Sequence, residues 1–243
     1  MPADAPTILA TSGGIDPGVR TKWSVGPLTQ HAVELAGVTG RAPRVCYLGT
    51  AGGDAPEGIR NFYDMTVEEG WHGSHVQLFT MPNVPDISEH LLTQDVVWVF
   101  GGSVAGLLAM WELHGVGEAM RTAWEAGVVL TGVSAGSICW HLGGTTDSFG
   151  PDLRPITNGL GLLPYSNGVH YDSEPQRRPL FQAMVADGTL PPGFATDDGA
   201  GLLYRGTELV EALAENATAG AYLVDRTPDG TALETPLDVR RLR

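Results

Sequence analysis

Short apolar runs, rich in β-branched residues and mostly bounded by glycine, recur through the first part of the chain. They are TILATSGG (7–14), RVCYLGTAGG (44–53), HVQLFTM (75–81), DVVWVFGG (95–102) and GVVLTGVS (127–134). Continuous apolar runs of this length are typical of strands that are buried on both faces. We therefore predict a strand in each.

Segments with helical spacing of apolar residues lie between these runs, at 28–37, 55–70 and 104–127. Strands that alternate with helices predict a mostly parallel sheet flanked by helices on both faces, an α/β fold. In such sheets the loops at the carboxyl ends of the strands form the functional site.

The pattern changes after about residue 165. We predict one helix in EPQRRPLFQAMVADG (174–188), followed by shorter strands in FATDDGAGLLYRG, TELVEALAE and AGAYLVDRT. We expect these strands to extend the same sheet in antiparallel orientation. Because the chain has no Pro- or Ser-rich linker and no internal repeat, we predict one domain over residues 1–243.

Composition narrows the classes of function. The formal net charge of −14 disfavours binding to nucleic acid or to an anionic membrane surface, because both need clustered Lys and Arg. No apolar run approaches the ~18–20 residues that span a bilayer, and the N-terminus lacks signal-peptide features. We expect a soluble, cytoplasmic protein. Cys46 and Cys139 lie in apolar settings, so we expect two buried free thiols.

The segment GVVLTGVSAGSICWHL contains the pattern GxSxG, with Ser134 between Gly132 and Gly136. A strand that turns sharply into a helix presents such a serine at the sheet edge, in a strained backbone conformation. The N–H groups of the following helix, beginning with that of Ala135, would stabilise a developing oxyanion. The alternative is that Ser134 only caps the helix.

The preceding predicted strand ends in a second glycine pair, Gly101-Gly102. If the two strand ends are neighbours, the N–H of Gly102 joins that of Ala135 in an oxyanion hole. The alternative is a tight loop that needs a residue with positive φ.

A serine nucleophile needs a base, and histidine has the suitable pKa. Most of the seven histidines lie in predicted helices or in a weak HxxH spacing at 72–75, and His141 lies on the helix after Ser134. His170 lies instead in the polar loop of PYSNGVHYDSEPQRR, and we choose it as the base. For the carboxylate that orients it, we prefer Asp198 over Asp197, both in FATDDGAGLL; an Asp-Gly turn is the structural alternative.

At this point the chain resembles the peptidase E-like serine peptidases, family S51, which include aspartyl dipeptidase and, more distantly, cyanophycinase. The resemblance rests on GVSAGS, HYDSEPQRR, DDGAGLL and FGGSVAGLL. It implies a fold like that of class I glutamine amidotransferases, flavodoxin-like with a nucleophile elbow. It also implies Ser134 as nucleophile, His170 as base, Asp198 as acid, and Gly102 and Ala135 as oxyanion donors.

The chain departs from aspartyl dipeptidases in two places. The glycine loop reads FGGSV where those enzymes carry an asparagine, and the acid is Asp198 where they often have glutamate. The first departure weakens the implied preference for N-terminal aspartate. Candidate substrate-binding residues are Ser103, Arg177 and Arg178; either arginine could hold a substrate carboxylate or pair with an acidic neighbour.

We therefore expect a serine peptidase, dipeptidase-like, that hydrolyses short peptides through a Ser-His-Asp triad. This chemistry requires no metal or organic cofactor. The expected partners are a small peptide and, at most, a second copy of the chain. One rival is an α/β-hydrolase esterase, but its order is Ser, acid, His, and no histidine follows His170. The other is a catalytically silent amidotransferase-like binding module.

Overall fold

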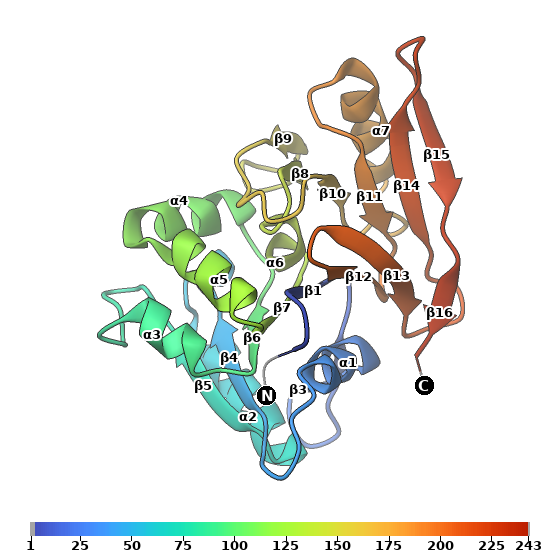
Figure 1. Ribbon diagram of the computed structural model, residues 1–243. Coiled ribbons are helices and arrows are strands. Elements are labelled where there is room, and N and C mark those ends of the chain that lie inside the picture. Colours follow the sequence, from blue (N-terminus) through green and yellow to red (C-terminus); the bar gives the residue numbers. More distant parts are fainter. Residues whose placement is uncertain (1–2, 243) are drawn as a thin grey trace.

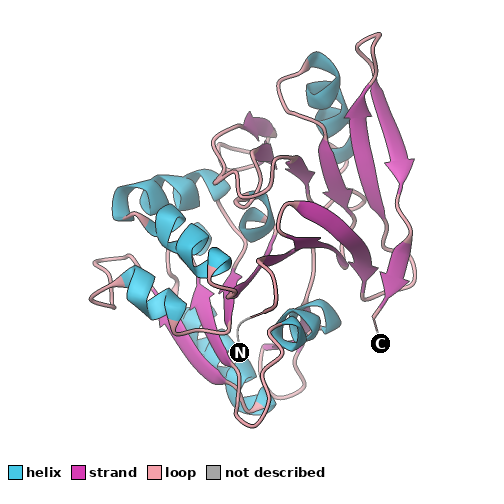
Figure 2. Cartoon of the chain, viewed as in Figure 1, coloured by secondary structure: helices cyan, strands magenta, loops and turns pink. Residues whose placement is uncertain are grey.

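The computed structural model describes residues 3–242, and its strands and helices are coloured in Figure 2. None of the helices within these residues has the length and apolar character that crossing a membrane requires. The helices are α1 (Pro27–Leu35), α2 (Pro56–Glu69), α3 (Ile87–Leu92), α4 (Val104–His114), α5 (Val116–Glu125), α6 (Ala135–Ile138) and α7 (Arg177–Asp187), with one 3₁₀ turn, η1 (Thr50–Gly52).

An eight-stranded sheet forms the centre of the molecule. Its order is β16 (Val239–Arg241), β13 (Glu208–Ala214), β12 (Ala200–Arg205), β1 (Thr7–Thr11), β7 (Val129–Val133), β6 (Val96–Val99), β4 (Arg44–Leu48) and β5 (His72–Val76). The five strands from β1 to β5 in this order run parallel to one another, and they are the five predicted from the apolar runs. β12 and β13 extend the sheet antiparallel.

Helices cover both faces of this sheet, because its buried strands are apolar on both sides (Figure 1). On β6, Val97 and Val99 pack into the cluster that contains α4 and α5. The alternate residues Val96 and Trp98 pack into the cluster that contains α1 and α2. This two-residue alternation places one helical layer on each face.

A second sheet of six strands takes most of the C-terminal part. Its order is β15 (Ala232–Pro236), β14 (Ala221–Arg226), β11 (Gly193–Thr196), β10 (Ser166–Gly168), β8 (Gly143–Thr146) and β9 (Arg154–Ile156), and α7 covers one face. A two-stranded hairpin, β2 (Ile15–Pro17) and β3 (Trp23–Val25), completes the strands. The prediction that all late strands extend the first sheet is therefore wrong for β11 and β14. The turn at residues 197–199 is one of the places where the chain passes from one sheet to the other, between β11 and β12.

Two predicted boundaries also differ. The single helix expected over 104–127 is two helices, because Gly115 has φ of 68°, which ends α4 and starts α5. The strand expected at 75–81 lies earlier, at His72–Val76, where it pairs with β4. Beyond β5, the Leu78 amide donates to Asp54 and not to a strand. β5 is an edge strand, so it needs fewer apolar residues than the pattern requires of a buried one.

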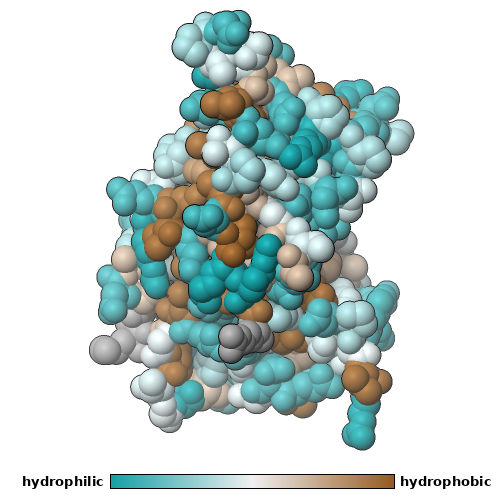
Figure 3. All heavy atoms as spheres, turned by 90° about the vertical axis from the view of Figure 1, so that its right-hand side faces the viewer, coloured by the Kyte–Doolittle hydropathy of each residue, from teal (hydrophilic) through white to brown (hydrophobic). Residues whose placement is uncertain are grey.

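The face that carries β13 to β16 is shown in Figure 3, where hydrophobic residues gather near the middle of a largely polar surface. Val210 on β13 and Leu233 on β15 are exposed, whereas Leu223 and Leu237 are partly buried against the main core.

The main core contains residues from both sheets, among them Phe194 of the second sheet and Ile8 of the first. The two sheets thus share one hydrophobic core.

Candidate active site

Ser134 stands at the sharp turn between β7 and α6. Its φ and ψ are 58° and −113°, a sparsely populated conformation that costs a non-glycine residue about 1–3 kcal/mol. The flanking glycines make the turn sterically feasible. A Cβ on Gly136 would lie 2.2 Å from the Val99 carbonyl oxygen, and one on Gly132 would lie 2.3 Å from the carbonyl oxygen of Gly136. The GxSxG pattern therefore reflects close backbone contacts on both sides of the serine.

The glycine loop after β6 lies beside this turn. A Cβ on Gly101 would lie 3.2 Å from the Cβ of Ser134, so the two residues are neighbours. Gly102 has φ of 137°, and a Cβ there would lie 2.4 Å from the Ala51 carbonyl oxygen. Within residues 3–242, the Gly102 amide donates to no turn, loop or cap carbonyl. The amide of Ala135 is the first of α6, one of the N–H groups that a helix leaves without an intrahelical acceptor.

Helix α6 is only four residues long, so its dipole is smaller than the sequence pattern suggested. Any oxyanion stabilisation here comes mainly from individual N–H groups. Ser103, predicted among the substrate-binding residues, caps α4: its Oγ accepts from the Gly106 amide at 3.1 Å.

His170 and Asp198 are in direct contact. The Nδ1 of His170 and the Oδ1 of Asp198 are 2.5 Å apart, and the two side chains are 23% and 47% exposed. His170 has φ of 53°, in the left-handed region. The Asp198 amide donates to the Oδ1 of Asp172 at 2.8 Å, which fixes the turn that carries the acid.

Asp197, the second choice for the acid, points elsewhere. Its Oδ2 accepts from the Gly220 amide at 2.8 Å and from the hydroxyl of Tyr222 at 3.1 Å. Burial is the main cause that raises the pKa of Asp197 above its ordinary value. The structure thus brings Asp198, and not Asp197, against the imidazole of His170.

The end of β1 links these segments, a role that sequence reasoning did not assign. The Ser134 amide donates to the Thr11 carbonyl at 3.1 Å, and the His170 amide donates to the Oγ of Ser12 at 3.4 Å. The Gly199 amide, beside the acid, donates to the Ser12 carbonyl at 2.9 Å. The sequence signal for this role was the Ser-Gly-Gly run that follows the first predicted strand, and such a run is not specific to any function.

Arg177 and Arg178 both pair with acidic neighbours, the second of the two alternatives. Arg177 is 3% exposed; its Nε donates to Glu174 at 2.7 Å, and its Nη1 donates to the Thr145 carbonyl at 2.6 Å. Arg178 pairs with Glu234 and stacks over two tyrosine rings. Arg177 is buried in these contacts, whereas Arg178 keeps part of its guanidinium exposed beside Glu234.

The other histidine and the two cysteines that the sequence singled out are buried. His141 is buried between Ser137 and Tyr204. Cys46 and Cys139 are buried free thiols, as predicted, and burial raises the pKa of Cys46 to about 12. In the described part of the chain, no group of three or more His, Cys, Asp or Glu side chains is arranged to hold a metal ion.

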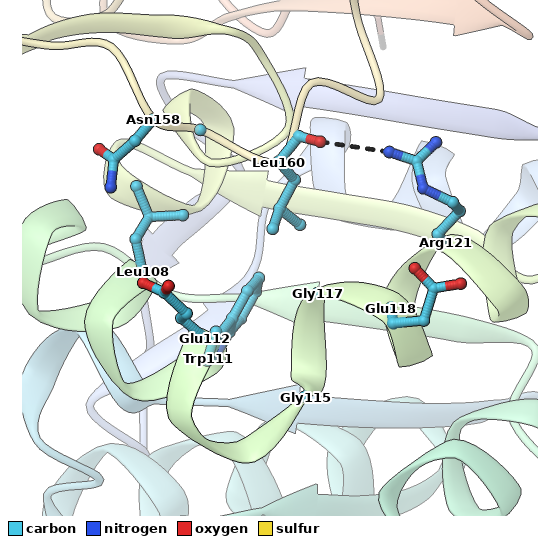
Figure 4. Close-up of a pocket in the computed structure, with 10 residues that line it drawn as sticks. Leu108, Trp111, Glu112, Gly115, Gly117, Glu118, Arg121, Asn158 and Leu160 are labelled. Atoms are coloured by element: carbon cyan, nitrogen blue, oxygen red, sulfur yellow. Dashed lines mark hydrogen bonds between the residues drawn. The ribbon is translucent and has the colours of Figure 1, made fainter.

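A crevice of about 450 Å³ lies elsewhere, between the α4–α5 turn and the loop 158–160 (Figure 4). Trp111 and Leu160 line it, and Arg121 at its edge donates to the Leu160 carbonyl at 3.3 Å. None of the site residues predicted from the sequence lines it, so it does not belong to the site around Ser134.

Comparison with known proteins gives one consistent result. The model of peptidase family S51 matches residues 23–212. An uncharacterized peptidase of Bacillus subtilis (strain 168), YgaJ, is 38% identical over 200 residues, which cover 82% of this chain and 85% of that protein.

Two solved structures share the fold. A peptidase from an acI-B1 actinobacterium superposes with a TM-score of 0.67 at 14% identity, over 97% of this chain and 95% of that one. A peptidase E candidate from Listeria monocytogenes EGD-e gives 0.59 at 17% identity, over 84% and 96%.

Proposed function

Since this chain belongs to peptidase family S51 and is a serine-type peptidase, we propose that it hydrolyses short peptides through a triad of Ser134, His170 and Asp198. The observation that carries the proposal is the bonded pair of His170 and Asp198, whose loops are tied to the same end of β1 as the Ser134 amide. An imidazole held by a carboxylate on one nitrogen keeps the other available as a base. Here Asp198 engages Nδ1, which leaves Nε2 for Ser134. The side chains of His170 and Ser134, both within residues 3–242, are not hydrogen-bonded to each other in this structure, and such catalytic hydrogen bonds often tighten only when substrate binds.

The reaction that follows from this arrangement has two halves. In the first, Oγ of Ser134 forms a bond to the peptide carbonyl carbon while Nε2 of His170 takes the hydroxyl proton. The N–H groups of Gly102 and Ala135 stabilise the oxyanion. The C–N bond then breaks, and His170 returns the proton to the leaving amine, which leaves an acyl-serine.

In the second half, water replaces the amine. His170 takes a proton from water as the water oxygen attacks the acyl carbon. The bond between Oγ of Ser134 and the acyl carbon then breaks, which releases the carboxylic acid. The imidazole returns the proton to Oγ of Ser134, which restores the enzyme. The same residues thus serve both halves without a cofactor.

The two candidate arginines do not by themselves establish a preference for an acidic substrate. Each already pairs with a carboxylate, Arg177 with Glu174 and Arg178 with Glu234, which offsets its positive charge. The preference that the family resemblance implies therefore stays a prediction. A dipeptide library that compares N-terminal Asp with neutral and basic residues tests it directly, because the relative kcat/KM values report which side chain the acyl pocket accepts.

The triad is tested by substitution at Ser134. We expect Ser134→Ala to abolish peptide hydrolysis and labelling by a fluorophosphonate, in which Oγ forms an O–P bond, fluoride leaves and His170 takes the proton. The matched control is Ser74→Ala, because Ser74 lies on β5 at the far edge of the sheet and bonds to Gln94. A folded Ser134→Ala protein that still hydrolyses peptides would refute the proposal.

The acid is tested by two adjacent substitutions. Replacing the carboxylate of a serine-protease triad by an amide lowers kcat by about 10⁴-fold. We expect a loss of that order in Asp198→Asn, and a much smaller loss in Asp197→Asn. The reverse ranking, measured on the purified proteins with the same dipeptide, would move the acid to Asp197.

A further inference from the structure

We propose that Ser12 is a positioning residue whose hydroxyl holds the loop that carries His170 in register with Asp198 and Ser134. This inference rests on the proposed function, because it concerns the same imidazole. Ser12 follows β1 and is 3% exposed. Its Oγ accepts from the His170 amide at 3.4 Å and lies 2.7 Å from the Oγ1 of Thr196.

The direction of the first of these hydrogen bonds follows from the chemistry of the groups. A backbone N–H can only donate, so Oγ of Ser12 is the acceptor from His170. The Oγ of Ser12 also shares a hydrogen bond with Oγ1 of Thr196, in which either hydroxyl can donate. Thr196 is fully buried, and its carbonyl accepts from the Tyr171 amide at 3.2 Å. Two successive amides of the histidine loop are thus held by one hydrogen-bonded pair of hydroxyl residues.

The backbone of Ser12 reaches the acid turn as well. Its amide donates to the Ala200 carbonyl at 2.8 Å, and its carbonyl accepts from the Gly199 amide at 2.9 Å. The turn that carries Asp198 is therefore pinned on the side of β1. Because Thr11 accepts from the Ser134 amide, two consecutive residues contact all three segments of the triad.

The segment after Ser12 is itself fixed. Glu215 accepts from the Gly14 amide at 3.0 Å through Oε1 and from the Leu28 amide at 3.4 Å through Oε2. The Glu215 amide donates to the Gly199 carbonyl at 2.9 Å. Ser12 is therefore bonded to a segment that cannot shift independently of the acid turn, which is what a positioning residue needs.

The histidine loop requires such a restraint. His170 has φ of 53°, a region that few non-glycine residues adopt and that neighbouring contacts help to maintain. Without the hydrogen bond at its amide, the loop can relax toward ordinary backbone angles. The imidazole then moves relative to Asp198 and Ser134, and a displacement of about 1 Å at a reacting group can cost 10²-fold in rate.

The test compares Ser12→Ala with Ser12→Thr, which keeps the hydroxyl, and with Thr7→Val as a matched control. Thr7 lies at the other end of β1 and is fully buried. Its hydroxyl donates to the Ala5 carbonyl at 2.7 Å and accepts from Nη1 of Arg205 at 2.5 Å, so its substitution removes a buried hydroxyl with two hydrogen bonds away from the site. Each protein is first checked for folding by thermal unfolding. Three quantities are then measured: kcat and KM for the best dipeptide, the rate of fluorophosphonate labelling, and the proton NMR signal of the His170–Asp198 hydrogen bond, assigned with His170→Ala.

We expect Ser12→Ala to lower kcat and the labelling rate by about 10- to 100-fold with little change in KM, and to shift or broaden the His170 signal. Ser12→Thr should recover most of both rates, and Thr7→Val should match the wild type. The inference is overturned if Ser12→Ala keeps the wild-type labelling rate and NMR signal, or if its rates fall no further than those of Thr7→Val. Failure of the triad itself appears separately, as activity that survives Ser134→Ala.

Discussion

Replacing His141 by asparagine should flatten the dependence of stability on pH between neutral and mildly acid conditions. His141 is fully buried; its Nδ1–H donates to the Ser137 carbonyl at 2.9 Å, and its Nε2 faces the hydroxyl of Tyr204 at 3.4 Å. The neutral imidazole therefore satisfies both ring nitrogens. Burial lowers the pKa of His141 from 6.5 to about 4, because the charged form cannot be solvated there.

The sign of the effect follows from proton linkage. Below about pH 6.5 the unfolded chain binds a proton at this residue that the folded chain does not, so protonation favours unfolding. The stability is fully present above the unfolded pKa and is lost as the pH falls toward the folded value. The total loss is at most about 3.4 kcal/mol, of which about 1.3 kcal/mol falls between roughly pH 7.5 and pH 5.5.

The assay is urea unfolding, followed by tryptophan fluorescence at several pH values between about 5.5 and 7.5. This interval lies above the sequence pI of about 4.7, so the protein keeps a net negative charge throughout. His141→Asn retains a donor for the Ser137 carbonyl but does not titrate. His72→Asn, on the exposed start of β5, is the control. The free energy of unfolding of the wild type and of the control should fall by about 1.3 kcal/mol more than that of His141→Asn. Equal slopes in the wild type and in His141→Asn would show that this histidine is not held neutral.

Three further outcomes test the site and its support. Gly136→Ala should misplace the nucleophile and cost about 3 kcal/mol or more, because its Cβ would lie 2.2 Å from the Val99 carbonyl oxygen; retained stability and activity would show that the elbow can yield. Arg177→Met should lower stability by roughly 2–4 kcal/mol and leave KM unchanged, because it strips a buried hydrogen bond from the Thr145 carbonyl; a selective rise in KM for acidic dipeptides would instead make it a substrate-binding residue. The thiol of Cys46, with its pKa raised to about 12 by burial, should resist iodoacetamide in the folded protein and react only after denaturation, as mass spectrometry would show.

Short-range patterns in the sequence determined the serine elbow and the parallel core. The strand, the two glycines and the serine at 127–136 are contiguous. The close contact that requires Gly132 arises within this segment, and the one that requires Gly136 arises against the neighbouring strand β6. The apolar runs likewise specify buried strands wherever both faces of the sheet are covered, as on β6. At β5, which lies at the edge of the sheet, the apolar pattern predicted a strand that begins at residue 75, whereas the strand begins at His72.

Only the tertiary structure decided which groups meet at the site. Ser12 and Thr196 are 184 positions apart, and their hydrogen bond forms because the chain passes from one sheet to the other between β11 and β12. The same crossing turns Asp198 toward His170 and Asp197 toward Gly220; the sequence favoured Asp198, but only the fold supplies the physical reason. Local backbone preferences act over a few residues, whereas the partner of a polar side chain depends on which distant segments the shared core brings together.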